Sequence, residues 1–281
     1  MSGVDTGTRA LVLTGLDRLM ARSVGDPAIG IGVLDGPAVL DHPDLAAPIT
    51  EIRPGACAVA TSAACGHGTL VAGVLGARRG TEAPGLAPRC PLLLRPIFTE
   101  DGAPTVPAVL ADGIVECVAA GARIINVSAA FTGAAPTGAH LLTEALDHAA
   151  RNGVLVVAAT GNEARLGGSP LTTHPWVIPV TACDDSGVPL AASNLGGSIA
   201  RTGVRAPGAR LVSLSSSGGF AAFGGTSAAA PVVTGAIALA WSLAPHVEAA
   251  TVRAAVRGRA GRGLVPPLLD AVAIHDAVTR S

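Results

Sequence analysis

The sequence contains no lysine and no tyrosine, and its aromatic side chains are only four Phe and two Trp among 281 residues. All 19 basic residues are therefore arginine; they are scattered along the chain and nearly balanced by 20 acidic residues. A nucleic-acid surface combines clustered positive charge with aromatic side chains on which bases stack. We therefore expect no nucleic-acid partner.

Long apolar segments are also missing. Charged residues make up 14% of the chain and hydrophobic residues 49%, which excludes a disordered chain. The longest apolar run, Ala228–Ala240, is shorter than the roughly 20 residues of a membrane-spanning helix. The run at Ala10–Leu13 is too short for the core of a signal peptide. We expect a cytoplasmic protein with no membrane partner.

Cysteine is sparse: the count is five, an odd number, and no CxxC pair occurs. This pattern indicates neither a disulfide framework nor a paired zinc motif. One bridge, between Cys57 and Cys65, remains open on spacing. We expect free thiols, in agreement with a reducing cytoplasm.

Short β-branched apolar runs alternate with longer helical patterns. Continuous apolar runs without polar alternation are typical of strands buried on both faces of a parallel sheet. The predicted strands are 29–34, 92–94, 124–127, 154–159 and 177–181. The predicted helices are 68–76, 106–120, 137–152 and 227–243. This alternation predicts a doubly wound α/β fold with a mostly parallel sheet and helices on both of its faces.

The helix ends and the domain organisation follow from local signals. Two of the helices start with capping chemistry, at Thr105 and Thr137, and two end at good C-terminal stops, Gly121 and Asn152-Gly153. No repeat or linker divides the chain, so we predict a single domain over residues 1–281. Residues 1–25 read as an N-terminal helical extension, and residues 246–281 as C-terminal helices.

Two segments near the N-terminus carry groups for acid–base chemistry. Asp35 ends a buried strand, where α/β sheets place functional groups, although a plain turn before Gly is the alternative. His67 stands between two glycines at the start of an apolar helix. A helix N-terminus disfavours positive charge, so we expect a neutral imidazole able to accept a proton. A surface histidine, or a zinc ligand with Cys65, is the alternative.

Two further segments supply a hydroxyl and an amide. Ser227 lies in the first turn of a long apolar helix among small residues, in the positive field of that helix end. A simple N-cap serine is the alternative. Asn162 follows a strand and Gly161, where its amide can donate to a developing oxyanion. An Asx-turn is the alternative there.

Taken together, these segments resemble the subtilisin-like serine proteases, the subtilases. The order Asp, His, Ser is that of the family. The matching text covers roughly residues 26–245: VLDG at Asp35, GHGTLVAG at His67, INVS at Ser128, AATGNE at Asn162 and GGTSAAAP at Ser227.

The resemblance implies a role for each matching residue. Ser227 would be the nucleophile, His67 the general base and then the acid, and Asp35 the group that orients the imidazole. Asn162 would complete the oxyanion hole with the Ser227 backbone N–H.

The resemblance also implies where substrate would bind. The segment Ser128, Ala129 and Ala130 matches the strand that pairs with the substrate backbone. Gly161 would border the first side-chain pocket, and Glu163 would lie at its rim, where a carboxylate favours a basic residue before the cut. Ala130 departs from the family, which usually has glycine there.

The chain also departs from the family after the histidine helix. There the calcium loop is replaced by Ala77–Ala83, which offers one carboxylate and two arginines. Asp44 matches a calcium ligand but lacks its partners. We therefore predict no metal and no cofactor. Few residues precede Asp35, so we expect an intracellular enzyme made without a signal or prodomain.

A closer likeness is to the prodomain-free subtilases that trim precursor peptides in cyanobactin-like pathways. The shared text is VLDGP with HPDL, GLAPRC followed by LLRPIF, and VTACDDSGVPLAASN ending at Asn194. This likeness predicts a serine endopeptidase whose partner is a peptide substrate, and whose reaction removes a leader from a ribosomally made precursor. A general intracellular protease is the first alternative, and an inactive subtilase used as a binding module is the second.

Overall fold

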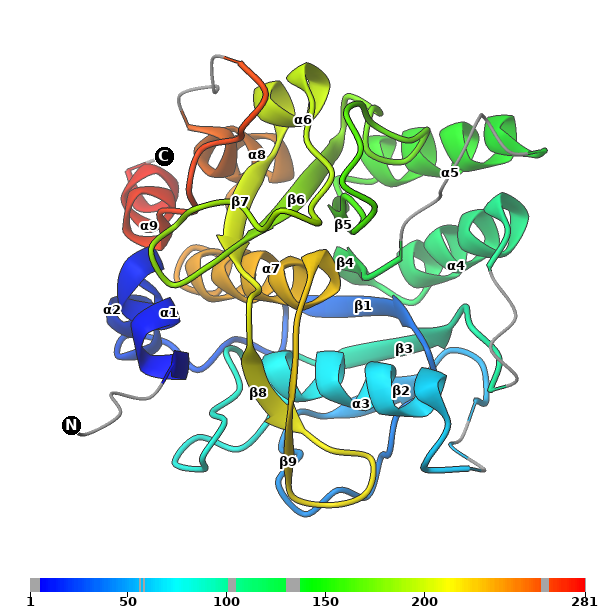
Figure 1. The fold of residues 1–281 in the computed structure, drawn as a ribbon, viewed down its shortest axis with the longest axis vertical. Coiled ribbons are helices and arrows are strands. Elements are labelled where there is room, and N and C mark those ends of the chain that lie inside the picture. Colours follow the sequence, from blue (N-terminus) through cyan, green and yellow to red (C-terminus); the bar gives the residue numbers. More distant parts are fainter. Residues whose placement is uncertain are drawn as a thin grey trace.

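The computed structural model describes residues 6–55, 57, 59–100, 105–129, 137–258 and 263–280. Its centre is a parallel sheet with the strand order β2-β3-β1-β4-β5-β6-β7 (Figure 1). The strands are β1 (Gly30–Asp35), β2 (Ile49–Glu51), β3 (Leu92–Pro96), β4 (Ala122–Val127), β5 (Leu155–Ala159), β6 (Val177–Cys183) and β7 (Val204–Pro207). All neighbouring pairs are parallel, which confirms the predicted fold class.

Each face of the sheet is covered by a hydrophobic core, because alternate side chains of each strand point to opposite faces. On β1, Ile31 and Val33 join one core, and Leu34 joins the other. Helices α3 (Ala63–Gly76) and α7 (Thr226–Ser242) cover the first face, and α4 (Pro107–Ala119) and α5 (Ala139–Arg151) cover the second. Figure 1 shows these two layers on either side of the strands.

The predicted caps of α4 and α5 are wrong, whereas the predicted stops are confirmed. Val106 and Gly138 occupy the two N-cap positions, and neither makes a side-chain capping bond. Proline at the first position of α4 has no N–H, so the start of this helix has one donor fewer to satisfy. Gly121 and Gly153 have φ of 85° and 65°, the left-handed conformation that ends a helix.

The ends of the chain add smaller helices. The N-terminal segment forms α1 (Thr6–Thr14) and α2 (Leu16–Met20), and the C-terminal segment forms α8 (Ala249–Arg257) and α9 (Ala271–Thr279). Helices α2, α8 and α9 add buried side chains to the core on the α7 face. The short helix α6 (Gly197–Thr202) lies between β6 and β7 along the chain. No helix within the described ranges has the length and apolarity to cross a membrane.

An antiparallel hairpin completes the fold. Strands β8 (Leu211–Leu214) and β9 (Phe220–Phe223) lie outside the main sheet and lead into α7. Ser213 of β8 donates its hydroxyl to the carbonyl oxygen of Leu70, 2.6 Å away, which fixes the hairpin against α3. The hairpin thus joins the two helices that carry His67 and Ser227.

Candidate active site

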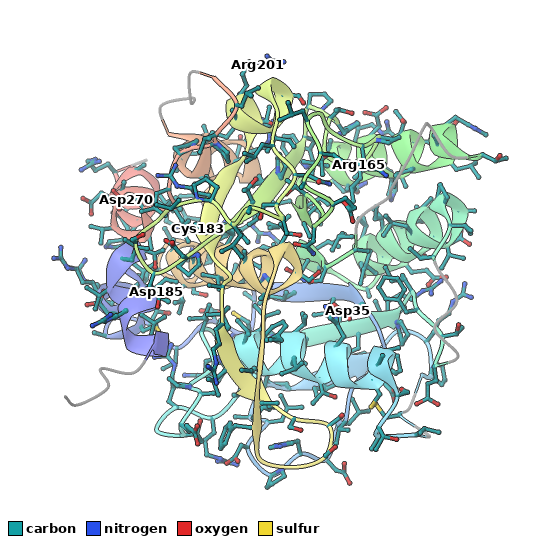
Figure 2. The ribbon with its side chains drawn as sticks, in the orientation of Figure 1. Asp35, Arg165, Cys183, Asp185, Arg201 and Asp270 are labelled. Atoms are coloured by element: carbon teal, nitrogen blue, oxygen red, sulfur yellow. A yellow bond between two sulfur atoms is a disulfide. The ribbon has the colours of Figure 1, made fainter. Side chains whose placement is uncertain are left out.

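The carboxyl ends of β1, β4 and β5 meet at one edge of the sheet, because the strands are parallel. Asp35 is the last residue of β1, and Ser128 and Thr160 follow β4 and β5 by one residue. Figure 2 shows Asp35 near the end of β1. Functional groups from three strands therefore converge where open α/β sheets bind their ligands.

His67 reaches this edge from α3. The helix begins at Ala63, with Ser62 as its N-cap accepting from the Cys65 N–H, so His67 lies in the second turn and does not open the helix. The helix approaches the end of β1 closely. A Cβ at Gly68 would lie 2.3 Å from the carbonyl oxygen of Pro37, which only glycine permits.

Asp35 and His67 form a hydrogen-bonded pair. His67 Nδ1 lies 2.7 Å from Asp35 Oδ1, which also accepts the Gly36 N–H at 2.6 Å. The Asp35 side chain is fully buried, whereas that of His67 is 33% exposed. The imidazole is thereby held with Nδ1 on the carboxylate, and its other nitrogen, Nε2, remains for proton transfer.

The charge on Asp35 controls the protonation of His67. Coulombic attraction to the carboxylate raises the pKa of His67 above its ordinary 6.5, burial opposes the shift, and the hydrogen bond adds to it. The sequence-based expectation that the helix N-terminus would keep the imidazole neutral is therefore wrong in direction. The carboxylate is in direct contact, whereas the helix field falls off within the first turn.

Ser227 is the second residue of α7, whose N-cap is Gly225, so it is not a capping serine. Its hydroxyl donates to the carbonyl oxygen of Ser128 at 3.2 Å. The Ser128 hydroxyl donates in return to the carbonyl oxygen of Ser227 at 3.3 Å. In the described part of the chain, the Ser227 hydroxyl thus bonds to a backbone carbonyl and not to His67.

Asn162 lies beside this helix start. Its Oδ1 accepts the N–H of Thr226 at 2.9 Å, so the bond runs to α7 and is not an Asx-turn. The Thr226 hydroxyl accepts the N–H of Gly161 at 3.1 Å. Oδ1 is engaged, whereas Nδ2 makes no hydrogen bond to the residues that the structure describes. The turn after β5 is thus joined to the first residues of α7 by two bonds.

Comparison with known proteins agrees with this arrangement. The subtilase family matches residues 26–272. Subtilisin DY of Bacillus licheniformis is 31% identical over 246 residues, which cover 84% of this chain and 85% of that one. The chain belongs to the subtilase family.

Solved structures of similar fold come from peptide maturation. The prenylagaramide maturation protease PagA is 30% identical with a TM-score of 0.83, covering 94% of this chain and 98% of that one. The patellamide maturation protease PatA is 31% identical with a TM-score of 0.79, covering 92% and 99%. The chain spans 58% of the length of subtilisin E of Bacillus subtilis (strain 168). This subtilase is a subtilisin-like serine endopeptidase.

The residues expected to bind substrate lie after β4 and after β5. Ser128 and Ala129 are buried directly after β4, whereas Ala130 lies outside the described residues. Gly161 is buried in the turn after β5, and Glu163 is exposed nearby. The Glu163 carboxylate accepts a hydrogen bond from Asn194 Nδ2 at 2.6 Å, so one of its oxygens is engaged within the protein.

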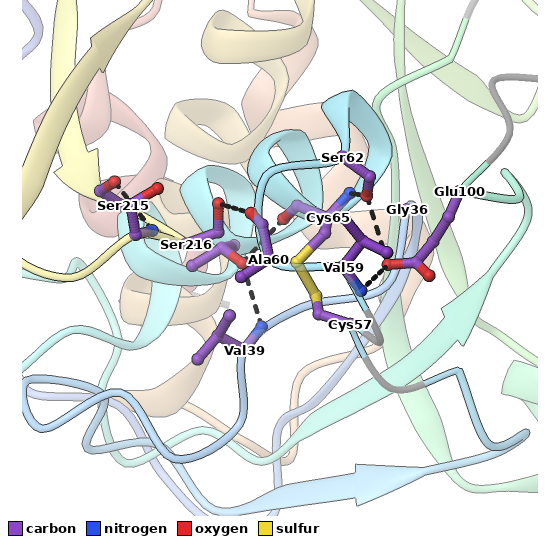
Figure 3. Close-up of a disulfide and its surroundings, with 12 residues drawn as sticks. Gly36, Val39, Cys57, Val59, Ala60, Ser62, Cys65, Glu100, Ser215 and Ser216 are labelled. Carbon is purple, nitrogen blue, oxygen red and sulfur yellow. Dashed lines mark hydrogen bonds between the residues drawn. A yellow bond between two sulfur atoms is a disulfide. The ribbon is translucent and has the colours of Figure 1, made fainter.

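A disulfide joins Cys57 and Cys65, with their Cα atoms 5.4 Å apart (Figure 3). The expectation of free thiols is wrong at these two positions. The segment after β2 folds back over the first turn of α3, which brings together two cysteines whose spacing alone did not decide the matter. Glu100 fixes the same segment, because its carboxylate accepts from the Val59 N–H at 3.0 Å and from the Ser62 hydroxyl at 3.3 Å.

The remaining described cysteines, Cys90, Cys117 and Cys183, are free and buried. Burial raises the pKa of each thiol, to about 12 for Cys117 and about 11 for Cys183. A buried thiol that stays protonated at neutral pH is a poor nucleophile. These cysteines therefore act as small apolar side chains of this subtilase.

In the loop after α3, the positively charged side chain of Arg79 bonds to backbone carbonyl oxygens of the same chain. The Arg79 guanidinium donates to the carbonyl oxygens of Met20, Ser23, Gly85 and Leu86. Backbone carbonyl oxygens are also what a hard metal cation would bind. Within the described ranges, no three His, Cys, Asp or Glu side chains gather as a possible metal site.

Sequence reasoning missed three polar residues behind the site. Asn126, at the end of β4, donates from Nδ2 to the Ser128 hydroxyl at 2.8 Å and accepts from the Thr234 hydroxyl at 2.9 Å. Asn126 and Thr234 are fully buried. Asn194 contacts the turn after β5. Polar residues within otherwise apolar segments indicate a buried hydrogen-bond network, but only the fold shows which partners they bond.

Proposed function

We propose that Ser227, His67 and Asp35 form the catalytic triad, with Asn162 as the side-chain donor of the oxyanion hole. The observation that carries this proposal is the buried Asp35 bound to His67 at the edge where Ser227 and Asn162 also lie. His67 would take the Ser227 proton during attack on the scissile carbonyl and return it to the leaving amine.

The proposal requires one movement. The Ser227 hydroxyl would leave the Ser128 carbonyl oxygen and turn toward His67 Nε2. Hydrogen bonds between catalytic groups are often long or absent before substrate binds. The Nδ2 of Asn162, an exposed residue, and the Ser227 N–H would then face the oxyanion.

Two variants test the catalytic assignment. A fluorophosphonate probe should label Ser227, as mass spectrometry of the labelled peptide would show, and Ser227→Ala should lose labelling and peptide cleavage together. Ser242→Ala is the matched control, because Ser242 lies at the other end of α7 and donates to the Ala238 carbonyl. Labelling at another residue, or full cleavage by Ser227→Ala, contradicts the triad.

We further propose that the substrate is a precursor peptide from which this subtilase removes a leader. PagA and PatA, both maturation proteases, support this at 30% and 31% identity over more than nine-tenths of the chain. The similarity to subtilisin DY, 31% identical, supports the general protease instead. The presence of all four proposed catalytic residues argues against an inactive binding module.

Cleavage profiling separates the two substrate classes. A library of peptides with randomised positions around the cut should give a narrow profile for a maturation enzyme. A broad profile, with casein degraded to many fragments, would favour general proteolysis. Glu163→Gln tests the pocket rim: if the Glu163 carboxylate reads a basic residue before the cut, preference for that residue should fall.

The cytoplasmic location and the single-domain organisation stay predictions. The location rested partly on free thiols, and the Cys57–Cys65 disulfide removes that support, since disulfides persist mainly in oxidising compartments. Mass spectrometry of protein taken from cells under alkylating conditions would show which thiol state prevails there.

A further inference from the structure

The turn that carries Asn162 is bent in an unusual way. Within residues 160–165, Gly161 has φ of 101° and Ala164 has φ of 54°. Among the described residues, Ala164 is the only one other than glycine with a positive φ. A side chain makes the left-handed conformation unfavourable, so this backbone persists only if its surroundings hold it.

The Asn194 side chain makes four hydrogen bonds to this turn. Its Nδ2 donates to the Thr160 carbonyl oxygen at 2.9 Å and to Glu163 Oε2 at 2.6 Å. Its Oδ1 accepts the N–H of Glu163 at 3.2 Å and the N–H of Arg165 at 2.9 Å. A carboxamide has two donor hydrogens and two acceptor lone pairs, so the hydrogen-bonding capacity of Asn194 is used completely.

The four bonds bracket Asn162 on both sides. Thr160 precedes it, and Glu163 and Arg165 follow it, on the two arms of the turn. The Asn194 backbone adds a bond from its N–H to the Gly161 carbonyl oxygen at 2.9 Å. Asn194 is 7% exposed, so its amide is largely shielded from water. The side chain therefore ties the start of the turn to its end.

We propose that Asn194 is a positioning residue for the oxyanion hole: it sets the turn that presents the Asn162 amide to the reacting carbonyl. Among the described residues, the Asn162 side chain makes one bond, from the Thr226 N–H to Oδ1, which leaves Nδ2 to donate. The backbone on both sides of Asn162 is bonded by the Asn194 side chain, in addition to the bonds from the Gly161 N–H to the Thr226 hydroxyl and from the Ala164 N–H to the Ala192 carbonyl oxygen. This inference rests on the proposed function, in which Asn162 stabilises the oxyanion.

A double-mutant cycle on hydrolysis of a peptide p-nitroanilide tests the inference. Asn162→Ala should lower kcat by about 10²–10³-fold with KM little changed. Asn194→Ala should lower kcat by about 10²-fold, because a displaced donor loses most of its effect. On the Asn162→Ala background, Asn194→Ala should cost less than about 3-fold, because the group that it positions is already gone.

The outcomes separate the two proposals. If Asn162→Ala leaves kcat unchanged, the oxyanion assignment fails and this inference fails with it. If Asn162→Ala lowers kcat but Asn194→Ala costs the same factor in both backgrounds, the catalytic assignment stands and Asn194 is only structural. Asn152→Ala is the matched control: Asn152 is the C-cap after α5, is exposed, and donates to the His148 carbonyl, so kcat should not change.

A second pair of variants decides the matter if Asn194→Ala does not fold. Asn194→Asp keeps the shape but places a carboxylate against the Thr160 carbonyl and the Glu163 carboxylate, so kcat should fall. Adding Glu163→Gln supplies an amide donor to the new carboxylate and should restore kcat by about fivefold or more relative to Asn194→Asp alone, a change the size of one hydrogen bond. Equal kcat in the single and double variants would overturn the inference.

Discussion

Ser128 and Ser227 hold each other by two hydrogen bonds, in which the hydroxyl of each residue donates to the backbone carbonyl oxygen of the other. The end of β4 and the start of α7 are therefore joined at the point where the proposed nucleophile stands. The pair continues through Asn126 to Thr234, two turns along α7. The proposed nucleophile is thus connected to a chain of buried hydrogen bonds. The position of the Ser227 side chain should therefore depend on residues that substrate does not contact.

The Asp35–His67 pair predicts the pH dependence of cleavage. The neutral imidazole is the active base, and Asp35 raises the pKa of His67, so kcat/KM should rise with pH through a midpoint above 6.5. Asp35→Asn removes the attraction that stabilises the imidazolium. Its midpoint should therefore move to lower pH, and kcat should fall by about 10⁴-fold, the size seen for this change in another serine protease. A midpoint that stays fixed in Asp35→Asn would show that another group titrates.

Thr234 predicts a stability effect remote from the surface. Thr234→Val keeps the shape of the side chain but leaves the buried Asn126 Oδ1 without its donor, which should cost about 1–3 kcal/mol. Thermal unfolding followed by circular dichroism should show Tm lower by roughly 2–4 °C for each kcal/mol. Thr279→Val is the control, because Thr279 is exposed and should change stability by less than about 0.5 kcal/mol. Equal losses in both variants would remove the special role of the buried pair.

The disulfide predicts a redox-dependent Tm. Cys57 and Cys65 are eight residues apart, and closing so short a loop stabilises the folded state by about 2–3 kcal/mol in the chain-entropy account. Cys57→Ser, or dithiothreitol on the native protein, should therefore lower Tm by about 5 °C or more. Dithiothreitol should add nothing to Cys57→Ser. A further fall in that variant would mean that reduction acts elsewhere.

Arg79 predicts stability without an added metal ion. Arg79→Ala would leave four half-buried carbonyl oxygens without their donor and should cost about 2–4 kcal/mol. Arg280→Ala is the control, since its side chain is 74% exposed and its ion pair with Asp276 is long at 4.0 Å. EGTA should leave the Tm of the native protein unchanged. A fall in Tm with EGTA would reveal a metal site that the chemistry of this loop does not suggest.

The main sheet could be predicted from the sequence because its inner strands are buried on both faces and are therefore apolar throughout. The five predicted strands correspond to β1, β3, β4, β5 and β6. The short edge strand β2 has one half-buried and two exposed residues, so its sequence resembles that of a loop. Strand β7 contains Arg205 and ends at Pro207, and hairpin β8–β9 is only partly buried. Strands β2 and β7 pair with β3 and β6, which lie further away in the chain, and the hairpin is fixed by the bond from Ser213 to Leu70 of α3.

The proposed catalytic residues were identified from the local sequence, because each lies in a motif where small residues surround one polar group. The residues that position them were not identified in this way. Asn194 stands in a polar turn like many others, and only the fold brings its amide against residues 160–165. The Cys57–Cys65 bond and the raised pKa of His67 likewise depend on contacts between segments. Local patterns indicate chemistry, whereas orientation and electrostatics follow from packing.

Arg79 also links the folding of the N-terminal helices to the folding of the loop before β3. An ion bound from solution contributes a stability that grows with its concentration and vanishes on dilution. The Arg79 guanidinium is covalently part of every molecule, so these carbonyl oxygens keep their donor whatever the ion concentration of the solution. Because its four acceptors come from the end of α2 and from the loop before β3, the two segments complete each other. The N-terminal helices and that loop should therefore form and melt as one cooperative unit.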